Sequence, residues 1–168
     1  MLAEMLRTLY GYNRWATEKI LDVATQFTPE QFLTLAPAAQ RSVRDNLVYL
    51  IGTQHGWLSR WDGSLTAAEA YRLKLDPADF QNIAPVRSAR EEVERKTQTF
   101  LSPFTDADVA RVCTFTLPNS CEWPVPLWQM MLYIVNHGSP HCSEAAMLLT
   151  CFGHSSCDLD MVFYLGEQ

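Results

Sequence analysis

The chain has no long apolar run. No stretch reaches the roughly 18 uninterrupted apolar residues that a membrane-spanning helix needs. The first twenty residues are amphipathic and carry several charges, whereas a secretory leader places its charges before one apolar block. These charged residues are Glu4, Arg7, Arg14, Glu18 and Lys19. We therefore expect no membrane partner and no secretory leader.

The chain is also poor in the features of a secreted or nucleic-acid-binding protein. Its 5 cysteines are an odd number without a CxxC motif, so we expect reduced thiols in the cytoplasm. Lys and Arg number 13 against 19 acidic residues, and the net charge of −6 repels a phosphate backbone. Basic residues between positions 87 and 96 alternate with glutamates, as on a solvated helix face. We expect no nucleic-acid partner.

What is present favours one folded domain. The chain has 168 residues, of which 48% are hydrophobic and 19% are charged, well away from the composition of disordered proteins. No linker-like stretch, internal repeat or low-complexity tract divides it. We therefore treat residues 1–168 as a single domain with a buried core.

Apolar spacing of three and four residues predicts four long helices. They cover residues 2–23, 43–61, 86–101 and 126–153, and Pro140 is expected to interrupt the last one with a kink just before His141. Residues 64–84 are expected to be irregular. Alternating residues at 112–117, a turn and residues 121–123 predict a small β-hairpin, and residues 158–165 predict a short closing helix. The fold class is thus all-α, with a hairpin inserted before the last long helix.

Two histidines stand four residues apart in the last long helix. At 100° per residue, His137 and His141 lie about 40° apart on one face, so both imidazoles can point at one ion. His55 lies in another apolar, helical stretch. Three neutral imidazoles suit Zn²⁺, Ni²⁺ or another first-row divalent ion and leave a position open for water or a thiolate. We therefore predict a metal site formed by His55, His137 and His141.

Glu144 follows on the same stripe and is the candidate catalytic residue. Its carboxylate can ligate the ion, orient a water molecule or accept a proton, and a supporting or solvent-facing position is the competing interpretation. Cys142 is rotated about 100° from His141 on an ideal helix, so we expect a small buried thiol. The five tryptophans are expected in the core and at interfaces, with one or two lining a pocket.

Several segments resemble the DinB-like family of bacterial metal-binding four-helix bundles, and the resemblance spans nearly the whole chain. The segments are Tyr12 to Ala16, His55, Thr116 to Asn119, Trp123 to Met130, Val135 to His141 and Asp158 to Leu165. The resemblance implies an up-down-down-up bundle with a long crossover after the second helix, often a homodimer. It also implies a divalent metal held at His55, His137 and His141. Bacterial thiol S-transferases and thiol-dependent isomerases share this architecture.

The chain departs from the family pattern after the last histidine. The family usually has Arg, a small residue and Gln there, whereas this chain has Cys142, Ser143 and Glu144. The change removes a cation that would bind an anionic substrate group. Two functions stay open. One is a metal-dependent thiol S-transferase-like or hydrolase-like enzyme acting on a small molecule, with a low-molecular-weight thiol as a candidate cofactor. The other is a non-catalytic metal-binding stress-response bundle. A pocket with a cationic wall would favour the enzyme.

Overall fold

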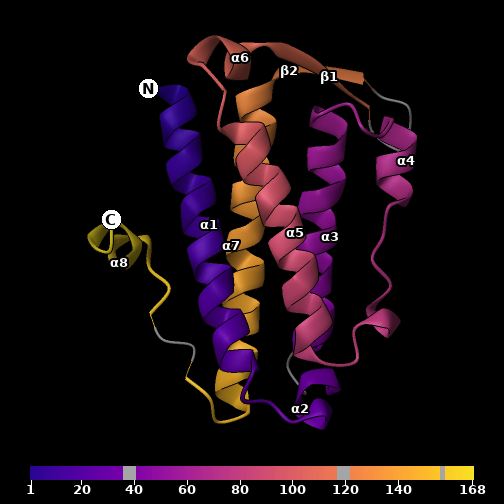
Figure 1. Cartoon of the computed structure of the whole chain (residues 1–168), viewed down its shortest axis with the longest axis vertical. Helices are drawn as coiled ribbons and strands as arrows, with labels where there is room; N and C mark the ends of the chain where they lie inside the picture. Colours follow the sequence, from indigo (N-terminus) through magenta and orange to yellow (C-terminus); the bar gives the residue numbers. More distant parts are fainter. Residues whose placement is uncertain (36–40, 117–121, 156–157) are drawn as a thin grey trace.

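The computed structural model describes residues 1–35, 41–116, 122–155 and 158–168. The protein is mostly helical, as the apolar spacing predicts, and four long helices lie side by side (Figure 1). They are α1 (Leu2–Ala24), α3 (Val43–Trp61), α5 (Ile83–Leu101) and α7 (Leu127–Cys151). None of the described helices is both long and apolar enough to cross a membrane.

Short elements lie between the long helices and after the last of them. They are α2 (Pro29–Leu33), α4 (Ala67–Arg72), the 3₁₀-helix η1 (Pro77–Asp79), α6 (Asp106–Ala110) and α8 (Met161–Gly166). The expectation that residues 64–84 are irregular is therefore wrong for α4, for η1 and for the start of α5, and it holds for the residues between them. Thr66 and Glu69 form a capping box, in which each side chain bonds the other residue's backbone N–H, and this pair stabilises the start of α4.

The predicted hairpin is present. Strands β1 (Val112–Thr116) and β2 (Glu122–Pro126) are antiparallel, and their register pairs Val112 with Pro126 and Thr116 with Glu122. The predicted turn, together with Leu117 and Cys121, lies outside the described residues. Strand β2 leads directly into α7, so the hairpin fixes the start of the helix that carries the histidine pair.

Helix α7 runs unbroken through Pro140, so the predicted interruption is wrong. A proline inside a helix costs roughly 3 kcal/mol because it removes one hydrogen bond and crowds the preceding turn. Buried side chains on both sides of Pro140, including Val135 and Leu148, hold the helix together across that defect. The helix keeps His137 and His141 one turn apart on one continuous face. The kink itself stays a prediction.

The apolar core consists of two clusters. The hairpin-side cluster is made of Ala3, Leu6, Tyr10, Leu101, Val109, Leu127, Met131 and Val135. The α2-side cluster is larger and includes Ile20, Leu21, Phe32, Val43, Leu47, Ile51, Val86, Val93, Leu148 and Leu149. Both clusters contain side chains from α1, α5 and α7, so these helices run through the two of them.

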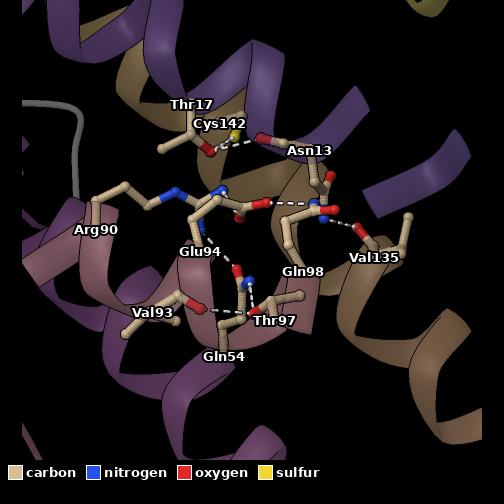
Figure 2. A network of polar contacts seen from close by, with 10 residues as sticks. All are labelled: Asn13, Thr17, Gln54, Arg90, Val93, Glu94, Thr97, Gln98, Val135 and Cys142. Atoms are coloured by element: carbon tan, nitrogen blue, oxygen red, sulfur yellow. Dashed lines mark hydrogen bonds and ion pairs between the residues drawn. The ribbon is translucent and has the colours of Figure 1, made fainter. Parts of the chain in front are cut away.

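A layer of buried polar side chains joins the long helices (Figure 2). Two of its members, Asn13 on α1 and Thr97 on α5, lie along their helices between residues of the two clusters. Arg90 is 1% exposed, and its guanidinium contacts Glu94 at 3.2 Å and donates to the Gln54 side chain at 2.6 Å. Gln54 donates in turn to the Thr97 hydroxyl at 3.0 Å. Because a buried polar group needs a partner, these bonds fix α3 against α5.

Asn13 makes a corresponding link between α1 and α7. Its side-chain amide donates to the Val135 carbonyl at 3.3 Å. A Cβ atom at Gly138 would lie only 2.6 Å from that amide nitrogen, so a larger residue at this position would displace the Asn13 side chain. Asn13 therefore ties the first helix to the last.

Candidate histidine pair and its neighbouring pocket

The structure brings His137 and His141 together on α7. Their ring centroids lie 4.6 Å apart with the ring planes at 69°. Both side chains are partly buried between α7 and the start of α3. The spacing of four residues produces this contact because such residues are neighbours on a helix face.

Tyr49 of α3 is the third ring of this group, and sequence reasoning missed it. It packs edge-to-face against His137 at 5.5 Å and against His141 at 5.1 Å, measured between ring centroids. Tyr133 lies one turn before His137 on α7. Its ring stacks on the His137 ring at 6.0 Å and contacts the Trp57 ring at 5.6 Å, both measured between ring centroids. A pattern in the sequence could have found Tyr49. Tyr49, Thr53 and Trp57 are spaced by four residues, which puts them on one side of α3, the side that lies against the pair.

His55 does not join the pair in this structure. Its charged neighbours are Lys96 and Glu92 of α5 and Asp62, and burial together with Lys96 lowers its pKa. At 100° per residue, position 55 is rotated about 160° from Thr53 and Trp57, so it faces away from α7. Among the described residues, no three His, Cys, Asp or Glu side chains converge closely enough to hold a metal ion.

The surroundings of the two histidines favour their neutral form. Burial lowers the pKa of both imidazoles, and the nearby Arg41 cation acts in the same direction. At His141 the Glu144 carboxylate partly opposes this effect. A neutral imidazole carries a lone pair, which is the form that binds a metal or accepts a proton.

Each histidine of the pair has one buried ring nitrogen that makes no good hydrogen bond within the described residues. His137 Nε2 and His141 Nδ1 are buried without a hydrogen-bond partner among the described residues. The Glu144 carboxylate lies 3.5 Å from His141 Nδ1, within ion-pair range although beyond a good hydrogen bond. The structure therefore places Glu144 beside His141, where it can orient the ring.

Cys142 points away from the pair, as predicted for a small buried thiol. Its sulfur lies 3.7 Å from the Thr17 hydroxyl of α1, and the side chain is 5% exposed (Figure 2). Burial raises the pKa of this thiol. Cys142 is therefore a packing residue and not a nucleophile of the histidine site.

A pocket of about 900 Å³ opens beside the pair, between α3 and the crossover that contains α4 and η1. Tyr49 and Tyr133, which contact the histidines, belong to its wall. Gly52 and Gly56 form part of the α3 side, and a Cβ atom at Gly56 would lie 3.2 Å from the Ala70 carbonyl. The missing side chains let the crossover pack close to the helix.

The pocket wall is rich in cations, which the linear sequence does not reveal. Arg41, Arg60, Arg72 and Lys74 line it. They are spread from residue 41 to residue 74 and come together only because the crossover folds back along α3. This is the cationic wall that would favour an enzyme acting on a small molecule. Trp57 also lines the pocket, in line with the prediction that one or two tryptophans do so.

Taken together, the structure defines a mainly helical protein with a histidine pair beside a small-molecule-sized pocket. The family model described as the DinB family matches residues 1–168, the whole chain. The chain therefore belongs to the DinB family, and the resemblance seen in the sequence is confirmed. A search of curated proteins found no match.

Membership of the DinB family suggests metal binding, and the donor set fits a divalent ion in part. The pair supplies two neutral imidazoles, and His137 Nε2 is buried without a partner among the described residues. The third imidazole predicted from sequence, His55, faces α5. The pair thus supplies two protein ligands, one fewer than the three of a typical catalytic zinc site.

Proposed function

We propose that this protein binds a divalent metal ion, Zn²⁺ or Ni²⁺, through His137 and His141 and acts on a small molecule. The reaction class is thiol S-transfer or hydrolysis. The buried nitrogen of His137 without a partner, next to a second neutral imidazole, is the observation that supports it. When bound at such a site, a divalent ion lowers the pKa of a coordinating water or thiol.

In this proposal Glu144 is a positioning residue. Its carboxylate faces His141 Nδ1 at 3.5 Å, and a carboxylate at one ring nitrogen fixes the ring and leaves the other nitrogen to act as a ligand. Tyr49 and Tyr133 flank the two imidazoles and limit the access of water. The cationic pocket supports the enzyme, since it offers a binding place for substrate beside the pair.

The second candidate is a non-catalytic metal-binding stress-response bundle. Two observations favour it. His55 lies away from the pair, and Cys142 is buried against Thr17 where the family usually has an arginine.

The proposal further includes a cytoplasmic homodimer, the use of a low-molecular-weight thiol, and an up-down-down-up order of the four long helices. A long connection between α3 and α5 supports that order.

Metal content tests the proposed site. Untagged protein is analysed by elemental mass spectrometry beside His137→Ala, His141→Ala and His55→Ala. We expect about one equivalent of a divalent metal in the parent and in His55→Ala, and its loss in the two pair variants, because only the pair supplies the ligands. A parent protein that takes up no metal at micromolar supply contradicts the proposal. Loss in His55→Ala as well would restore the three-histidine site.

Turnover separates the two candidates. The loaded protein is incubated with a model electrophile, monochlorobimane, and cysteine as the thiol. Conjugation that exceeds the uncatalysed rate and is lost in His137→Ala supports the transferase. Metal binding without conjugation, and without hydrolysis of a panel of small esters and amides, supports the non-catalytic candidate.

A further inference from the structure

Three cations of the pocket beside the histidine pair form no ion pair within the described part of the chain. Among the described residues, no carboxylate lies at ion-pair distance from Arg41, Arg72 or Lys74. Asp45, the one carboxylate of the described wall, is already paired with Arg44 at 2.8 Å. A concentration of cations in a chain of net charge −6 is selective for anions that fit the pocket.

The same wall is aromatic. The Arg41 guanidinium lies 4.3 Å from the centre of the Tyr49 ring, and the Arg60 guanidinium lies 4.6 Å from the centre of the Trp57 ring. At Arg41, stacking on the ring face positions the guanidinium and leaves its N–H edge able to bind an anion. Tyr71 and Tyr133 extend the aromatic surface.

We propose that this pocket binds a small organic anion whose carboxylate, sulfonate or phosphate pairs with the cations and whose apolar or aromatic body lies against the rings. Its volume of about 900 Å³ suits such a ligand, since pockets for drug-sized molecules span roughly 300–1,000 Å³. An inorganic anion alone would leave the aromatic wall in contact with water.

Tyr49 connects this ligand to the histidine pair. It lines the pocket and contacts both imidazole rings, so a bound anion lies next to the pair. The inference thus names a substrate class for the proposed enzyme, namely small organic anions. It rests on the proposed function in one respect, which is that the bound anion is taken as the substrate. It also offers a replacement for the arginine that the family usually has directly after the last histidine. In this chain the positive charge comes from α3 and the crossover.

Calorimetric titration with naphthalene-2-sulfonate tests the inference. Naphthalene-2-sulfonamide, which has nearly the same shape without the charge, is the matched neutral probe. We expect the sulfonate to bind at least about tenfold more tightly than the sulfonamide, and its affinity to fall with added salt. Equal affinity of the two probes, or no binding of the sulfonate up to millimolar concentration, would overturn the inference.

Variants locate the bound anion. Arg41→Gln and, separately, Lys74→Gln are each expected to weaken sulfonate binding about tenfold or more, because each removes a charge-assisted contact. Arg41→Lys keeps the charge and should retain more of the affinity than Arg41→Gln. Arg95→Gln makes the same charge change on the exposed side of α5 and should leave binding unchanged. Equal weakening by Arg95→Gln would show a general charge effect and overturn the site.

The same variants separate this inference from the proposed metal site. Sulfonate binding is measured with and without metal and in His137→Ala, and metal content is measured in Arg41→Gln. If the sulfonate binds but no variant or parent holds metal, the anion pocket stands and the metal proposal fails. If metal binds normally and the sulfonate does not, the anion pocket fails alone. Thermal unfolding of Arg41→Gln and Lys74→Gln checks that both variants remain folded.

Discussion

Two cysteines of α7 differ sharply in their surroundings. Cys142 is 5% exposed, packs on Thr17 and has a raised pKa because it is buried. Cys151, the last residue of the helix, is exposed. A thiol reacts as its thiolate and only where reagent reaches it, so the two residues should differ in rate on both grounds.

We predict that iodoacetamide at pH 8 alkylates Cys151 readily and Cys142 at least about a hundredfold more slowly. The slow reaction requires opening of the folded state, which costs several kcal/mol in an ordinary domain. Peptide mass spectrometry over time measures both rates in one sample, and a denatured sample is the control in which they converge. Comparable rates in the folded protein would mean that the Cys142 thiol reaches solvent and is available to the histidine site.

At the residue scale the sequence predicts contacts within one helix better than contacts between helices. The spacing of His137 and His141 determines that they are neighbours, and the rotation of Cys142 away from them follows from the same geometry. The position of Tyr49 depends on how α3 is rotated against α7. His55 and Tyr49 lie on different sides of α3, and only the packing of that helix against two neighbours decides which side faces the pair.

Helix α5 carries two ion pairs of the same spacing in opposite environments. Arg90 and Glu94 are almost fully buried, whereas Lys96 and Glu92 lie at the surface. Both pairs are separated by four residues. A buried charge that loses its partner keeps its desolvation cost, whereas a surface charge returns to water.

We predict that Arg90→Met lowers the free energy of unfolding by about 3–5 kcal/mol, since Glu94 and Gln54 are left buried without their partner. The double variant Arg90→Met/Glu94→Leu should recover most of this loss. Lys96→Met breaks the surface pair and should change stability far less. Urea unfolding measures all three. A double variant that is as unstable as Arg90→Met alone would show that the layer stabilises the fold through more than this pair.

At the element scale the long helices were predictable and their connections were not. Apolar periodicity finds α1, α3, α5 and α7 to within a few residues at most ends, because each buries one face over several turns. The α4 turn is too short for such a pattern. Only its capping box at Thr66 and Glu69 indicates a helix in the sequence. The prediction that Pro140 interrupts the last long helix was wrong because tertiary packing along α7 outweighs the low helix propensity of proline.

The molecule as a whole is divided by its polar layer but joined by its helices. The hairpin-side cluster and the α2-side cluster have separate apolar contacts, and Asn13 and Thr97 of the polar layer lie between residues of the two clusters along α1 and α5. A molecule of this kind can unfold from one end first or as one unit. The decisive feature is that α1, α5 and α7 each contribute buried residues to both clusters, so neither cluster can lose its structure without disrupting helices of the other.

We therefore predict one cooperative unfolding transition that a defect at either end shifts as a whole. Leu6→Ala removes buried side-chain volume from the hairpin-side cluster, and Leu148→Ala does so in the α2-side cluster. Each should lower the free energy of unfolding by about 2–5 kcal/mol and leave the slope against urea concentration unchanged. Far-UV circular dichroism and tryptophan fluorescence should give the same midpoint. Two transitions, or a shallower slope in only one variant, would mean that the polar layer separates two units, and the histidine pair would then lie near their boundary.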